Sequence, residues 1–147
     1  MRMALLAGLA VVLLAGCGSD GGGSGSDSGG GKASLSGPVT YERGGGLAGR
    51  RDRLVVRPDG SATLTVREKS TTVKLTGKEL DSLASDLEAA DLGSVPSEST
   101  SERPVPDAFG YRVSYGGDTV TTDSAAMPKK LRGLMARLGG LVDRYAQ

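Results

Sequence analysis

The sequence contains no histidine, no tryptophan and a single cysteine, Cys17, among its 147 residues. The missing histidine excludes a Ser–His–Asp triad, a Cys–His pair and an imidazole metal ligand. One cysteine forms no intrachain disulfide and no zinc site that needs several cysteines. Lysine and arginine (18) nearly balance aspartate and glutamate (17), so we expect no nucleic-acid partner. These absences favour a binding or structural role over an enzyme, and we expect no catalytic residue, no cofactor and no metal.

Carboxylates are the remaining acid–base candidates, and their pattern indicates solvent exposure. One expected helix carries five of them, scattered over its polar side: Glu79, Asp81, Asp86, Glu88 and Asp91. Asp118 and Asp123 flank an expected strand, but the Asp-x-Asp-x-Asp-Gly spacing of a calcium loop is missing. The carboxylates therefore predict a solvated surface rather than an active site.

Residues 1–16 have the pattern of a secretory signal peptide, with Arg2 before an apolar run over residues 3–15. The run is short for a transmembrane helix, which needs about 20 residues. Its end, Leu14-Ala15-Gly16-Cys17, resembles a bacterial lipobox, which implies cleavage before Cys17 and a diacylglycerol on its sulfur. An ordinary signal peptide or an uncleaved anchor is the alternative.

Residues 17–37 are expected to be the lipidated cysteine and a disordered tether, because residues 18–31 are all Gly, Ser or Asp. A flexible chain of this kind has a typical reach of about 25 Å over roughly 20 residues. The Gly-, Ala- and Arg-rich, Lys-poor usage resembles that of high-GC actinobacteria. We therefore expect a lipid-anchored protein on the extracytoplasmic face of the cell membrane.

Residues 38–147 are expected to form one α+β domain, a small antiparallel sheet with two helices on one face. The expected order is β-β-β-β-α-β-β-α. Alternating apolar and polar residues place the strands at residues 39–43, 53–57, 61–67, 71–75, 109–115 and 118–123.

Two helices are expected from capping and periodicity. Thr76 and Glu79 form a capping box before a helix that ends at residue 90 or 91, with Gly93 as its stop. Residues 93–107 are expected to be a long loop. Pro128 is expected to start the second helix, whose apolar stripe extends to Tyr145.

A glycine-rich segment over residues 44–49 separates the first two expected strands and contains one large apolar residue, Leu47. Either Leu47 is presented by the loop, or the loop is flexible and Leu47 packs on the core. A basic cluster adjoins this segment: Arg43, Arg50, Arg51, Arg53 and Arg57. It favours an acidic partner or anionic headgroups, or else it is charge that protects an edge strand from aggregation.

The stretch from Tyr41 to Gly49 resembles the opening of the emfourin-like protealysin inhibitors, a strand that ends in Arg-x-Gly-Gly-Phe/Leu-Ala-Gly. The resemblance continues in order through the Leu-rich helix at residues 80–90, the Asp107-x-Phe-x-Tyr111 strand and the helix start at Pro128. It covers about residues 39–145.

This resemblance implies a secreted thermolysin-like zinc metalloprotease as the partner, bound at its active-site cleft. Such proteases favour a bulky apolar residue just after the scissile bond, which implies Leu47 as the residue in that pocket. The implied contact residues are Arg43, Gly44, Gly45, Gly46, Leu47, Ala48, Gly49 and Arg50. A non-inhibitory envelope lipoprotein that binds another partner is the alternative function.

Overall fold

The computed structural model describes residues 34–103 and 105–147. The predicted signal peptide, Cys17 and the tether up to residue 33 lie outside this part of the chain, so the anchoring hypothesis stays a prediction. No helix in the described ranges is both long and apolar enough to span a bilayer.

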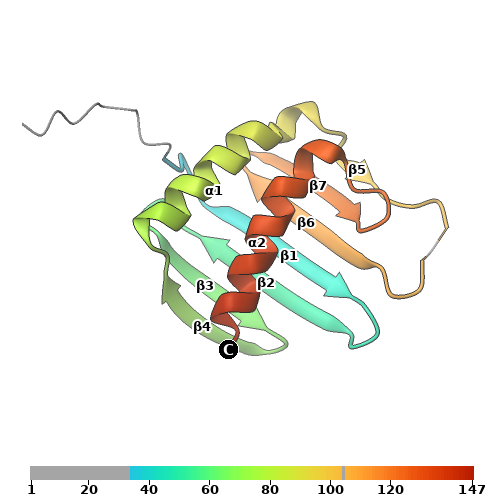
Figure 1. The fold of residues 1–147 in the computed structure, drawn as a ribbon, viewed down its shortest axis with the longest axis horizontal. Helices are drawn as coiled ribbons and strands as arrows, with labels where there is room; N and C mark the ends of the chain where they lie inside the picture. Colours follow the sequence, from blue (N-terminus) through green and yellow to red (C-terminus); the bar gives the residue numbers. More distant parts are fainter. Residues whose placement is uncertain (1–33, 104) are drawn as a thin grey trace, which may run out of the picture. The chain divides into compact units, whose positions relative to one another are not determined.

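The described chain is an α+β domain built on one seven-stranded sheet, with strand order β4-β3-β2-β1-β6-β7-β5 (Figure 1). The strands are β1 (Val39–Gly45), β2 (Arg50–Val56), β3 (Ser61–Val66), β4 (Lys69–Lys74), β5 (Glu98–Ser99), β6 (Phe109–Tyr115) and β7 (Asp118–Asp123). The helices are α1 (Gly77–Ala90) and α2 (Arg132–Tyr145), with short 3-10 turns at η1 (Leu92–Ser94) and η2 (Lys129–Leu131).

The expected α+β class is confirmed, but the expected all-antiparallel sheet of six strands is wrong in one respect. The segment predicted as a long loop contains β5, which pairs parallel to β7 through Glu98–Thr121 and Ser99–Thr122. The Asp123 carboxylate secures this segment by accepting bonds from the backbone N–H and hydroxyl of Ser101. The strand β5 has only two residues, and its partners lie in and at the end of β7. Two residues are too few to show an alternating pattern in the sequence.

The alternation along the strands divides the sheet into a covered and an open face. Val39 and Tyr41 of β1, Leu54 of β2 and Val113 of β6 are fully buried, and both helices lie over this face (Figure 1). The residues between them face the other side, which carries mostly threonine, serine and arginine and is called the open face below. Polar residues on that side let an antiparallel sheet stay solvated there.

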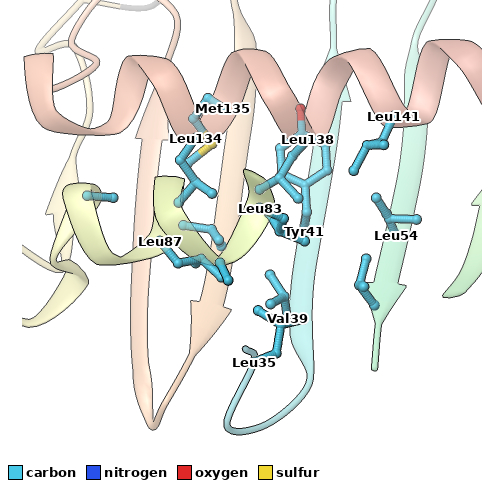
Figure 2. Packing of buried hydrophobic residues seen from close by; sticks show 14 of the residues in the cluster. Leu35, Val39, Tyr41, Leu54, Leu83, Leu87, Leu134, Met135, Leu138 and Leu141 are labelled. Carbon is cyan, nitrogen blue, oxygen red and sulfur yellow. The ribbon is translucent and has the colours of Figure 1, made fainter. Parts of the chain in front are cut away.

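The core forms between the helices and the covered face. Figure 2 shows Leu83 and Leu87 of α1 and Leu138 of α2 pointing toward the sheet, in which β1 carries Tyr41. Full burial of one leucine side chain stabilises a domain by roughly 1.5–3 kcal/mol. The helical apolar stripes seen in the sequence therefore become the second layer of the fold.

The ends of α1 follow the predicted capping with one correction, whereas α2 begins at Arg132, after the 3-10 turn that follows Pro128. The Thr76 hydroxyl accepts from the Glu79 backbone N–H at 3.3 Å, and Glu79 accepts from the Thr76 backbone N–H at 2.8 Å, which confirms the capping box. Asp91, rather than Gly93, takes the left-handed conformation that ends α1, with φ of 45°. Asp is among the few non-glycine residues that adopt this conformation readily.

Candidate functional site

The candidate site is the turn between β1 and β2, formed by residues 46–49. It is shorter than the predicted loop, because Gly44 and Gly45 continue β1 and pair with Gly110 and Phe109 of β6. The Gly49 backbone N–H donates to the Gly46 carbonyl at 3.0 Å and closes the turn. The loop is therefore a tight hairpin turn at the end of two paired strands.

The glycines at the base of the turn are required by space as well as by backbone conformation. Gly45 has φ of +102° and Gly46 has φ of +71°, both in the region that favours glycine. A Cβ on Gly45 would lie 2.7 Å from the Ala108 carbonyl, and one on Gly46 would lie 2.9 Å from the Phe109 ring. The Gly46 N–H also donates to the Ala108 carbonyl at 3.4 Å. The glycine run thus seats the turn closely against the start of β6.

Leu47 is 91% exposed at the turn, which excludes the interpretation that it packs on the core. Val105, at 49%, is the other exposed large hydrophobic of the described chain. It lies on a neighbouring segment, because Ala108 donates to the Val105 carbonyl and accepts from Gly46. An apolar side chain held this far into solvent buries little surface in the domain and contributes little to its stability.

An ion-pair cluster lies beneath the turn, on the covered face. Arg43 donates to Asp52 of β2 at 2.7 and 2.9 Å and to Asp143 of α2 at 2.8 Å. The side chains of Arg43 and Asp52 are 10% and 2% exposed. Arg50, half exposed, adds a 3.3 Å contact to Asp143. The resemblance implies Arg43 as a contact residue, but its side chain is largely buried in this cluster, whereas Arg50 stays accessible.

The electrostatics of this cluster follow from its hydrogen bonds. The bond from Arg43 holds the pKa of Asp143 below its usual value, against the opposing effect of partial burial. Arg43 also lies over the Phe109 ring, with 5.9 Å between the guanidinium carbon and the ring centroid. Removing one partner of a buried charge pair costs about 3–5 kcal/mol. The cluster therefore fixes the last residues of β1 to β2, β6 and α2.

The Tyr41 hydroxyl lies deeper on the same face and is buried without a hydrogen-bond partner among the described residues. Its ring stacks on Tyr111 with 6.3 Å between centroids. Burial raises the pKa of Tyr41 well above its usual value, so the phenol stays neutral. The Tyr41 side chain therefore supports the turn by packing of its ring and carries no charge.

The structure brings seven of the eight predicted contact residues together in two groups. Gly46, Leu47, Ala48 and Gly49 form the turn, and Arg50 stands beside it. Gly45 and Arg43 support it from β1. Gly44 belongs to neither group, because it faces the open side of the sheet. Within residues 34–103 and 105–147, no group of three His, Cys, Asp or Glu side chains is arranged to hold a metal ion.

Sequence reasoning missed the residues that support the turn, chiefly Asp52, Asp143 and Phe109. Asp52 pairs directly across from Arg43 in the hairpin register, so a correct register would have found it. Asp143 lies 100 residues from Arg43 along the chain and leaves no local signal.

No protein-family model matches the sequence, and no curated protein is significantly similar to it.

Proposed function

We propose that this protein binds and inhibits a secreted thermolysin-like zinc metalloprotease, with the turn at residues 46–49 placed in the active-site cleft. The observation that carries the proposal is the 91% exposure of Leu47 on a turn whose backbone is held by hydrogen bonds. In this proposal Leu47 fills the apolar pocket that accepts the residue after the scissile bond. The narrow glycine and alanine neighbours let the turn enter a cleft.

The preformed turn supports affinity. Burial of the Leu47 side chain is worth about 1.5–3 kcal/mol. A loop that is already ordered loses less conformational entropy on binding than a flexible one. The Gly49–Gly46 and Gly46–Ala108 bonds provide that order before any partner arrives. Arg50, accessible at the edge, is placed to affect the association rate more than the affinity.

The predicted anchor on Cys17 precedes the described domain in the chain, and the domain begins at the end of β1 that lies away from the turn. The chain enters the described domain at Leu35, next to the start of β1 at Val39, and the turn follows the opposite end of the strand at Gly45. Seven residues of strand separate the two ends by about 20 Å. The point where the preceding residues join the domain is therefore separated from the turn by the length of β1.

Titration of thermolysin with the full chain carrying Cys17→Ser tests the inhibition. Residual peptidase activity is measured for this chain and for a Leu47→Asp variant. Thr72→Asp, on the exposed edge strand β4, adds the same charge away from the turn and serves as the control. We expect Leu47→Asp to weaken inhibition by about tenfold to a hundredfold, because about 1.4 kcal/mol corresponds to a factor of ten. Thr72→Asp should inhibit like the parent.

Mass spectrometry of the mixture separates inhibition from simple competition by a substrate, since an inhibitor stays uncut while the protease is blocked. An absence of inhibition at micromolar concentration, or equal inhibition by Leu47→Asp, would refute the proposal. An absence of inhibition would leave the alternative of an envelope binding module whose partner is not a metalloprotease, and equal inhibition by Leu47→Asp would show that another surface binds the protease.

A further inference from the structure

A hollow of about 420 Å³ lies on the open face of the sheet, away from the covered face that supports the turn. Glu42 and Gly44 of β1 border it, and these residues alternate with Tyr41 and Arg43, which face the helices. The side chains around it come from β2, β3, β6, β7 and the β3–β4 turn. They include Arg51, Arg53, Arg67, Arg112, Thr65 and Thr121.

Two glycines form part of this hollow, and the fold itself does not require them. Gly44 of β1 and Gly110 of β6 lie directly opposite each other in the register, and neither has a positive φ. A Cβ on Gly44 would have the Arg50 carbonyl at 3.7 Å as its nearest neighbour, and one on Gly110 the Gly44 carbonyl at 3.9 Å. Both are ordinary contacts. Glycine inside a strand weakens it and often marks a place where a ligand approaches the backbone closely.

The charge around the hollow is strongly positive. Five arginines and two carboxylates border it. Arg43 and Asp52 pair with each other on the covered face, so four arginines are left with Glu42, which pairs with Arg53 at 3.2 Å. Within the described ranges, no ion pair joins Arg51, Arg67 or Arg112 to a carboxylate. Three guanidinium groups of like charge around one space repel each other, and a bound anion would relieve that repulsion.

The neighbouring carboxylates are occupied elsewhere. Asp52, which also borders the hollow, has its side chain on the covered face in the pair with Arg43. Asp123 lies opposite Gly110 in the register, but its carboxylate accepts from the backbone N–H groups of Ala125 and Ala126. These bonds hold it at the end of β7.

We propose that this hollow binds a phosphate group, carried either by a soluble phosphate compound or by the headgroup of an anionic phospholipid. The guanidinium fork matches phosphate oxygens in a bidentate arrangement, and Arg51, Arg67 and Arg112 supply three such forks. The hydroxyl of Thr121 provides a further donor at its side, and that of Thr65 shares a hydrogen bond with Ser70 at 2.8 Å. The volume falls in the range of small-molecule sites, about 300–1,000 Å³. Gly44 and Gly110 leave the backbone bare where the anion lies.

Calorimetric titration with inorganic pyrophosphate at low ionic strength tests the first source, with the full chain carrying Cys17→Ser. Arg51→Gln and Arg112→Gln should each weaken binding about tenfold. Arg57→Gln is the matched control, because Arg57 is exposed on the same side of β2 and changes the net charge equally but does not border the hollow. It should leave the affinity unchanged.

Vesicle sedimentation tests the second source, with phosphatidylglycerol vesicles compared with phosphatidylcholine vesicles. The double variant Gly44→Ala/Gly110→Ala fills the hollow with two methyl groups and should weaken anion binding about tenfold, while its melting temperature is kept or raised. Loss of pyrophosphate binding in the variants assigns the hollow to soluble phosphates, and variant-dependent binding to phosphatidylglycerol alone assigns it to headgroups. Binding of neither probe, or equal weakening by Arg57→Gln, would overturn the proposal.

Discussion

The glycines near the candidate turn differ in what the backbone requires of them, and alanine substitutions separate these requirements. Gly44 has neither a positive φ nor a close neighbour. Gly49 has φ of +55° and open space around it. Gly45 has φ of +102° and the Ala108 carbonyl 2.7 Å from the position of its missing Cβ. The three positions therefore form a series with no constraint, one constraint and two.

The expected losses in the free energy of unfolding follow from these constraints. Gly49→Ala should cost about 1 kcal/mol, because the left-handed conformation is unfavourable for alanine by about 1–2 kcal/mol and the unfolded chain loses some entropy. Gly45→Ala adds the displacement of Ala108 and the loss of its bond with Gly46, worth about 0.5–1.5 kcal/mol, for a total of about 2–3 kcal/mol. Gly44→Ala should stabilise by about 0.4–1 kcal/mol through the unfolded state.

Urea unfolding followed by far-UV circular dichroism measures the series, since the chain has no tryptophan for fluorescence. The midpoints should rank Gly44→Ala above the parent, Gly49→Ala below it and Gly45→Ala lowest, with equal m-values. At about 4 °C per kcal/mol, the melting temperatures of the two extremes should differ by about 12 °C. If Gly44→Ala lowers the free energy of unfolding as much as Gly45→Ala does, then positive φ and lack of space for a Cβ do not explain the losses, and the reasoning is refuted.

Two further predictions concern buried and capped polar groups. The backbone N–H of Ser101 and that of Ala126 donate to Asp123 and lower its pKa to about 2, so its stabilising effect is present above about pH 4 and is lost as the pH falls toward 2. Thermal melts should therefore show the advantage of the parent over Asp123→Asn shrinking from pH 4 to pH 2, and a constant difference would contradict this cause. Tyr41→Phe removes a buried hydroxyl that has no partner among the described residues. The free energy of unfolding should stay unchanged or rise by up to about 1 kcal/mol, which thermal melts detect as an equal or higher melting temperature. A clear drop would show that the hydroxyl has a partner.

The parts of the fold that local physics determines were predictable from the sequence. The alternation of Ala62, Leu64 and Val66 gave both the strand and the face that is buried. The Thr76–Glu79 capping box gave the first residue of α1. Each of these signals lies within a few residues of the structure that it specifies.

The parts that depend on distant partners were not predictable. The first strand was expected to end at Arg43, but pairing with Gly110 and Phe109 of β6 extends it by two glycines. The support of Arg43 by Asp143 joins residues 100 positions apart. The exposure of Leu47 was left open, because the sequence does not show whether a loop folds back onto the core.

The alternation of β1 also separates the two proposed sites within a few residues. Arg43 and Gly45 face the covered side and hold the turn, whereas Glu42 and Gly44 face the open side and border the hollow. Because neighbouring strand residues point to opposite faces, a substitution on one side leaves the contacts of the other side in place. The turn and the hollow therefore lie mainly on opposite faces of one strand, although Arg43 and Asp52 border both. Substitutions at Leu47 and at Arg112 accordingly test the two proposals separately.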